Sequence, residues 1–437
     1  MADQTVNAST NPIIDDRLRG FPPGHPPIAL AAIGEQGWKP HDGTMALPLM
    51  SIDEAAFAGN VRAMFGYVRG QGIEIAPHAK TPMSTAIARA LISSGAWGTT
   101  VADIRQTSVF LKAGLSRLVI ANETGGLAAA RRLAAAVAAF PAAELHIFVD
   151  SIDAVDALRQ AWSERDDLPA LGLLIEFGAG RAGARTIETG TALLDAILSA
   201  ESGTFRLTGI AAYEGAAATP DPNETIDRIN SLMALTAQFL RSARARLNDR
   251  RRLIVTAGGS VYFDMVVNWL GKAVANDENS LLVLRSGAIF FHDHGVYERG
   301  LKNLDTRRGF IVDGSVRSAS SEFVPALRLW AEILSRPEPG LAIAGMGMRD
   351  VANDQDLPRP LWLYRDGQRI SDLAGTTVLR LNDQHAFVKL SEQAELRVGD
   401  VVEFGVSHPC TCLDRHAILY GLDADHRVTK AYLTSFG

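Results

Sequence analysis

Eight short apolar runs, each followed by a long amphipathic stretch, constrain the fold of this 437-residue chain more than any other feature. The runs are continuous rather than alternating, as expected of strands that are buried on both faces. Strands that alternate with helices indicate βαβ units and a parallel sheet. We therefore predict an α/β fold in which eight units close a (β/α)8 TIM barrel. The runs are IEIAP (73–77), TTVA (99–102), RLVIANE (117–123), LHIFVD (145–150), GLLIEFG (172–178), LTGIAAYEG (207–215), RLIVTAGG (252–259) and SLLVLRSGA (280–288).

Two regions of different character flank the predicted barrel, which we assign to residues 46–305. Residues 1–45 are rich in proline, glycine and polar residues, and indicate an N-terminal arm that packs on the second domain or on a partner subunit. After residue 305 the apolar positions alternate and Asp-Gly and Gly-Asp pairs appear, which predicts a mainly antiparallel β domain over 306–437. An open doubly wound sheet is the alternative to the barrel, but no glycine-rich turn follows the first run.

The composition limits the possible partners. The formal net charge is −6, so the chain lacks the concentrated basic face that a nucleic acid or an anionic membrane requires. It contains no run of 18 apolar residues, so we expect no membrane-spanning helix. Its only cysteines are Cys410 and Cys412, and its start lacks the pattern of a secretory signal. These features predict a reducing, cytoplasmic location.

The segment PHAKTP (77–82) directly follows the first run. Lys80 is therefore expected three residues past the first strand, at the C-terminal face where barrel enzymes act. In an apolar and partly enclosed setting the ammonium form of lysine is disfavoured, which makes the amine nucleophilic. From this feature alone, an ordinary lysine at the barrel rim is the simpler interpretation.

Two glycine-containing loops follow later runs at the same face. In TAGGS (256–260), Gly258 and Gly259 allow backbone N–H groups to approach an anion and Ser260 can begin a helix, at a position where barrels commonly bind phosphate. In EFGAGRAGAR (176–185), Arg181 is expected at the rim, where it would hold an anionic group or a cofactor ring. The alternatives are a plain tight turn and a solvent-exposed arginine.

Two further segments carry residue types that bind metals. In SHPCTC (407–412), His408 and Cys410 would point to the same side of an extended strand, and imidazole with thiolate is a zinc ligand pair. Two ligands suit an open site that water and substrate complete, although a buried cysteine beside an ordinary histidine has the same pattern. In HDH (292–294), His292 and His294 would share one side of a strand, and polar rim residues explain this segment equally well.

Taken together, these segments resemble the D-serine dehydratase / D-threonine aldolase family, from about residue 46 to the end of the sequence. The family has an alanine-racemase-like (fold type III) barrel followed by a β domain. PHAKT resembles the segment of its cofactor lysine, and SHPC is the other most specific match. The remaining matches are Gly180–Gly183, Tyr213–Gly215, Gly258–Ser260, LRSGAIFFHDHGVY (284–297) and GMGMRDVANDQDLP (345–358).

The resemblance implies a cofactor, a metal and a substrate class. Lys80 would bind pyridoxal 5′-phosphate as a Schiff base, and His408 with Cys410 would bind a metal, for which the thiolate favours zinc. The substrate would be a small D-amino acid. A homodimer is expected, in which the β domain of one subunit closes the barrel mouth of the other. The cofactor-binding residues that the resemblance implies, besides Lys80, are His78, Arg181, Tyr213, Gly258, Gly259 and Ser260.

The expected reaction is metal-assisted β-elimination, as in D-serine dehydratase, which yields an oxo acid and ammonia from D-serine or a related D-β-hydroxy amino acid. A His-x-Cys pair resembles the dehydratases of the family, whereas His-x-Asp is commoner among its aldolases. Retro-aldol cleavage to glycine and an aldehyde is the alternative, and an amino-acid racemase or a non-catalytic pyridoxal-phosphate-binding protein is more remote. Pro82 and Ala216 stand where the family often has histidine, which predicts a bulkier or more acidic substrate; Cys412 stands where threonine is commoner.

Overall fold

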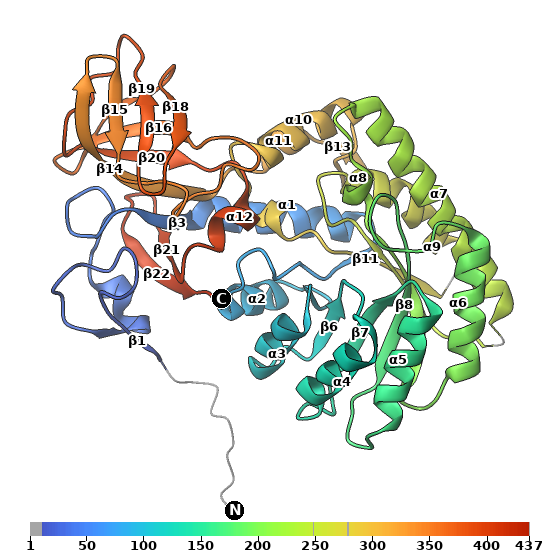
Figure 1. Cartoon of the computed structure of the whole chain (residues 1–437). Coiled ribbons are helices and arrows are strands. Elements are labelled where there is room, and N and C mark those ends of the chain that lie inside the picture. Colours follow the sequence, from blue (N-terminus) through green and yellow to red (C-terminus); the bar gives the residue numbers. More distant parts are fainter. Residues whose placement is uncertain (1–10, 248, 278, 437) are drawn as a thin grey trace, which may run out of the picture.

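The chain folds into a barrel and a β-rich part that lie side by side (Figure 1). The computed structural model describes residues 11–247, 249–277 and 279–436. The barrel contains eight parallel strands in the order β4–β11–β10–β9–β8–β7–β6–β5, and a parallel bridge between His78 and Thr100 joins the two ends of this order. Each predicted apolar run forms one strand, which confirms the predicted fold class. The strands are β4 (Glu74–Ile75), β5 (Thr99–Val101), β6 (Arg117–Ile120), β7 (Glu144–Val149), β8 (Leu171–Phe177), β9 (Phe205–Ala212), β10 (Leu253–Ala257) and β11 (Ser280–Leu284).

Helices cover the outside of the barrel (Figure 1). Several begin at an aspartate, serine or threonine whose side chain accepts a hydrogen bond from a free amide of the first turn, as Asp53 does from Ala56. No helix in the described ranges is long and apolar enough to cross a membrane. The helices are α1 (Glu54–Gly70), α2 (Thr85–Ser93), α3 (Ile104–Lys112), α4 (Gly126–Val137), α5 (Ile152–Ser163), α6 (Ile187–Ala200), α7 (Pro222–Arg246), α8 (Phe263–Val266), α9 (Lys272–Ala275) and α10 (Val296–Arg307).

The barrel is filled rather than hollow. Buried side chains of its strands, among them Val119, Phe148 and Leu174, occupy the interior. A second and larger apolar core separates the strands from the helices. Because the interior is packed, a ligand reaches the barrel only at the ends of the strands, and catalytic residues of such barrels come from the C-terminal ends.

The β-rich part is a ten-stranded sheet with mainly antiparallel pairing. One of its strands, β3 (Leu49–Asp53), precedes the barrel in sequence and pairs with β14 and β21. Our assignment of residues 46–305 to the barrel therefore misses this long-range pairing, which no local pattern reveals. The other strands are β14 (Leu327–Glu338), β15 (Leu341–Ala344), β16 (Arg359–Arg365), β17 (Gln368–Asp372), β18 (Thr377–Leu381), β19 (Ala386–Lys389), β20 (Val401–Gly405), β21 (Ile418–Leu422) and β22 (Val428–Leu433).

The described part of the N-terminal arm packs on this sheet. Phe21, Ile33 and Trp38 are buried in one apolar cluster with Trp330 and Tyr420 of the sheet. The arm therefore completes the hydrophobic core of the β-rich part of its own chain, one of the two positions that the sequence predicts for it.

Candidate active site

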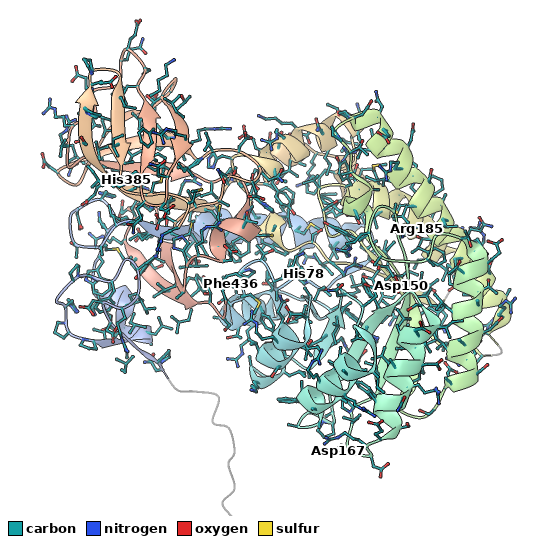
Figure 2. All side chains as sticks on the ribbon, in the orientation of Figure 1. His78, Asp150, Asp167, Arg185, His385 and Phe436 are labelled. Carbon is teal, nitrogen blue, oxygen red and sulfur yellow. The ribbon has the colours of Figure 1, made fainter. Side chains whose placement is uncertain are left out.

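The Lys80 loop lies at the C-terminal mouth of the barrel, between β4 and α2 (Figure 2 labels the neighbouring His78). The side chain of Lys80 is exposed, not enclosed as the sequence suggested. The Nδ1 atom of His78 lies 3.5 Å from the Lys80 amide. Burial, together with the positive charges of Lys80 and Arg285, lowers the pKa of His78 well below its usual range. His78 is therefore neutral and adds no charge beside the lysine.

The Lys80 loop contacts the candidate metal segment of the same chain. Thr81 is 1% exposed, and its Oγ1 lies 3.2 Å from Cys410 Sγ. The end of the chain also reaches this loop, because the Ser435 amide donates to the Met83 carbonyl at 2.7 Å. The barrel mouth and the His408–Cys410 segment thus meet within one subunit. Closure of the mouth by the β domain of a partner subunit stays a prediction.

The alternating pattern predicted that His408 and Cys410 lie on an extended strand, and this prediction is wrong. The chain leaves β20 and starts a short helix, α12 (Pro409–Leu413), with His408 at its N-cap. Proline is favoured in the first turn of a helix, so Pro409 is the local cause of this turn. The two side chains nevertheless lie together and are joined by a hydrogen bond.

A carboxylate from another loop orients His408. Asp354 Oδ2 lies 2.7 Å from His408 Nδ1, and Thr411 donates to Asp354 Oδ1 at 2.7 Å. Burial opposes the charged imidazole, but the hydrogen bonds with Cys410 and Asp354 outweigh it and raise the pKa of His408 to about 9. Burial likewise opposes the thiolate of Cys410, but hydrogen bonds with His408 and Thr81 lower its pKa below the usual range.

This arrangement fits an open metal site. Because Asp354 occupies Nδ1, the Nε2 atom of His408 and the sulfur of Cys410 are the atoms left to bind a metal. A histidine ligand held by a carboxylate is the usual arrangement around zinc. Within the described ranges no group of three or more His, Cys, Asp or Glu side chains is arranged to hold a metal ion. A metal on this pair would therefore need further ligands from water or substrate.

The HDH segment is a buried loop rather than a strand. His292 has a φ of 48°, and Asp293 accepts the amides of Gly295 and Tyr297 at 2.6 Å and 3.1 Å. The His294 amide donates to the Val406 carbonyl at 2.8 Å. The loop thus ties the start of α10 to the segment before His408, which is a structural role.

The glycine loop after β10 is held by a carboxylate. Glu214 is fully buried and accepts the amides of Gly258 and Ser260 at 2.9 and 3.0 Å, and the Ser260 hydroxyl at 2.6 Å. We expected these groups to face an anion directly, so a phosphate here would compete with Glu214 for the same donors. Gly259 lies against the Tyr213 ring, which an added Cβ would approach to 3.1 Å.

Two arginines surround this loop. Arg181 lies over the Tyr213 ring, with 5.2 Å between its guanidinium carbon and the ring centroid. Arg285 is 2% exposed and donates to the Thr256 hydroxyl and the Ala212 carbonyl, both at 2.8 Å. The sequence analysis missed Arg285. An arginine within the apolar run 280–288 is nevertheless a signal, because it indicates a charged residue at the C-terminal end of a barrel strand.

Comparisons with known proteins agree with this architecture. Residues 52–261 match the family model described as the alanine racemase N-terminal domain, and residues 326–422 match a putative serine dehydratase domain. The fold of the chain is therefore alanine-racemase-like. Among curated relatives, the chain is 25% identical to 3-hydroxy-D-aspartate aldolase of Paracoccus denitrificans (strain Pd 1222), over 83% of the chain and 84% of the relative.

Two other relatives have solved structures or structures of variants. A D-threonine aldolase from Filomicrobium marinum superposes with a TM-score of 0.70 at 22% identity, over 90% of this chain and 95% of that one. D-threo-3-hydroxyaspartate dehydratase of Delftia sp. (strain HT23) is 25% identical over 54% of the chain and 66% of the relative. Its solved variants carry alanine at a histidine and at a cysteine two positions later, and the cysteine variant is in a metal-free form.

Proposed function

We propose that this chain is a pyridoxal-phosphate-dependent lyase that acts on a D-amino acid with a hydroxyl group on Cβ. The observation that carries the proposal is the contact between Thr81 and Cys410, which brings the candidate metal pair to the loop of the candidate cofactor lysine. The positive charge of Lys80 also contributes to the lowered pKa of the Cys410 thiol. The relatives named for 3-hydroxyaspartate support the substrate class.

The residues at the barrel mouth fit the proposed cofactor. Lys80 offers an exposed amine for covalent attachment, and the Tyr213 ring with Arg181 above it offers a flat face and a cation. When bound, pyridoxal phosphate withdraws the electrons of a bond broken at Cα, and a divalent metal acts as a Lewis acid at the hydroxyl oxygen. The other proposed cofactor-binding residues are His78, Gly258, Gly259 and Ser260. A phosphate that takes the amides of Gly258 and Ser260 has to displace Glu214 from them.

The side chains of the protein divide the remaining work. His408 Nε2 and Cys410 Sγ are the proposed metal ligands, and Asp354 fixes the orientation of the imidazole through Nδ1. The spacing of these ligands matches that of the histidine and cysteine altered in the Delftia dehydratase. The amine of Lys80 is the proposed proton carrier at Cα, since a lysine at the barrel mouth is well suited to general acid–base work.

Two reactions share these groups. In retro-aldol cleavage the Cα–Cβ bond breaks, the hydroxyl loses its proton and Cα gains one, which gives glycine and an aldehyde. In dehydration the Cα proton and the hydroxyl leave, and hydrolysis gives an oxo acid and ammonia. We propose retro-aldol cleavage first, because two of the relatives described above are aldolases. Dehydration is the second candidate, which the His-x-Cys pair favours, and D-serine is a substrate with which to test it.

Product analysis tests the proposal and separates the two reactions. Purified protein loaded with pyridoxal phosphate and zinc is incubated with D-threo-3-hydroxyaspartate, D-threonine or D-serine, and with the L-isomers as controls. Glycine with an aldehyde identifies the aldolase, and an oxo acid with ammonia identifies the dehydratase. Activity on D-isomers that a chelator abolishes is the expected result. No product from any D-isomer, with the cofactor visibly bound, would overturn the proposal.

A further inference from the structure

Two acidic side chains inside the barrel mouth have no part in the proposed reaction. Glu123 follows β6, and Glu176 lies near the end of β8, where it is 2% exposed. Glu123 Oε1 and Glu176 Oε2 are both buried and accept no hydrogen bond from an N–H or hydroxyl group of the described residues. A buried carboxylate oxygen without a donor is costly, so the arrangement requires an explanation.

The two side chains explain each other. They lie within hydrogen-bonding reach, and two carboxyl groups form such a bond only when one of them holds a proton. Asp150, which follows β7, adds another negative charge beside Glu123. Burial, the hydrogen bond and charge of Glu176, and the charge of Asp150 together raise the pKa of Glu123 to about 8.

The same pair faces the two cations of the candidate cofactor site. Arg181 Nη2 lies 3.7 Å from Glu176 Oε1, and the charge of Glu176 also acts on the buried Arg285. Asp150 Oδ2 accepts the Gly183 amide at 3.0 Å, which fixes the loop that carries Arg181. The charged groups around the pair therefore come from the loop after β7, from β8 and the loop after it, and from the end of β11.

We propose that Glu123 and Glu176 share one proton in the resting protein, and that this proton leaves Arg181 available to an anionic ligand at the barrel mouth. Loss of the proton adds a second negative charge beside Glu176. That charge attracts Arg181 toward the pair and repels a bound phosphate. The first half of the inference is independent of any reaction, and the second half rests on the proposed function because it takes pyridoxal phosphate as the ligand.

Infrared difference spectroscopy tests the shared proton directly. The protein at pH 6.5 should show the carbonyl stretch of a protonated carboxyl group, and this band should disappear as the pH rises through about 8. Glu123→Gln should remove the band. Glu176→Gln should move its loss to a lower pH, because the hydrogen bond and the charge of Glu176 contribute to the raised pKa of Glu123. Burial raises the pKa of Asp293 to about 7, so Asp293→Asn identifies its separate band. A band that survives in Glu123→Gln, or that disappears at the same pH in Glu176→Gln as in the native protein, would overturn the shared proton.

Ligand affinity tests the second half of the inference, that the shared proton leaves Arg181 available to an anionic ligand. The probe is 4′-deoxypyridoxine 5′-phosphate, which has no aldehyde and cannot bond to Lys80. If binding of the probe requires the shared proton, its affinity for the native protein falls about tenfold per pH unit above the pKa of the pair. This fall adds to any pH dependence that Glu123→Gln also shows. Ligand titration is common to both proteins and cancels in the comparison. Parallel pH curves would overturn this half, whereas absence of the proposed lyase activity would leave both tests intact.

Discussion

Glu144 at the N-terminal end of the barrel and the Glu123–Glu176 pair at its C-terminal end have opposite surroundings. At the N-terminal ends of the strands, Glu144 lies 2.5 Å from Arg117 and 3.2 Å from His146, and the hydrogen bond with His146 is the largest cause that lowers its pKa to about 2. At the C-terminal ends, Glu123 and Glu176 interact with each other, and each has a buried oxygen that accepts no hydrogen bond from an N–H or hydroxyl group of the described residues. Structural stability explains the paired end. The buried oxygens of Glu123 and Glu176 lower the stability of the C-terminal end, and such destabilising groups are typical of functional sites.

Removal of Lys80 has the largest expected effect, and it tests whether the C-terminal end of the barrel is the functional end. Lys80→Ala should abolish the absorbance of the bound cofactor and lower turnover by about 10²–10⁴-fold, because the attachment point and the proton carrier are both lost. The matched control is Lys112→Ala, at the end of α3, where an exposed lysine follows no barrel strand. Absorbance spectra and circular dichroism check both variants. Native cofactor absorbance in Lys80→Ala would contradict the assignment.

The neighbouring cysteines provide the next test. Cys410→Ala should lose the bound metal and lower turnover by at least about 10²-fold, because a metal Lewis acid contributes several kcal/mol. Cys412 is fully buried in the same helix, and burial raises the pKa of its thiol to about 11. Cys412→Ala should therefore keep the metal and lose only some thermal stability. Metal analysis of the dialysed proteins decides the matter, and equal metal content in both variants would contradict the proposed ligand.

Substitution of Asp354 should have a smaller effect on the same site. Asp354→Asn keeps the shape of the side chain but weakens its hold on His408 Nδ1, and loss of such a partner typically lowers metal affinity by about 10–100-fold. Competition with a coloured chelator measures the change. The control is Asp356→Asn, an exposed aspartate two residues away that pairs with Arg299. Equal metal affinity in both variants would mean that Asp354 does not orient the ligand.

The sequence reveals the barrel better than it reveals the site. Continuous apolar runs are local patterns, so all eight barrel strands could be predicted from them. The link between Asp354 and His408 spans 54 positions and depends on how two loops meet, which no local pattern contains. Glu123 and Glu176 stand at the ends of predicted runs, but their mutual contact depends on the closure of the barrel. Pro409 is a local signal for the start of a helix, but the alternating apolar residues before it led to the prediction of a strand.

The smallest expected effect is on the melting temperature, whose pH dependence compares the carboxyl groups at the two ends of the barrel. The pKa of Glu123 is about 8 in the folded protein, above its ordinary value of 4.5, so the folded state keeps a proton that the unfolded chain has released. This stabilisation is fully present below pH 4.5 and is lost as the pH rises through about 8. Glu123→Gln removes the dependence, so its melting temperature relative to the native protein should rise from pH 5 to pH 8.5. The expected gain is a few degrees, about 2–4 °C per kcal/mol.

Glu144→Gln is the matched substitution at the opposite end of the barrel. Its carboxyl has a lowered pKa, so the stabilisation is present above its ordinary value of 4.5 and is lost only as the pH falls toward about 2. Between pH 5 and pH 8.5 the melting temperature of this variant should therefore differ from that of the native protein by a nearly constant amount, equivalent to about 1 kcal/mol or less for a half-exposed pair. Calorimetry across this range compares both variants. If the two show the same pH dependence, the unpaired carboxyls of the mouth hold no extra proton, and the contrast between the two ends is one of geometry alone.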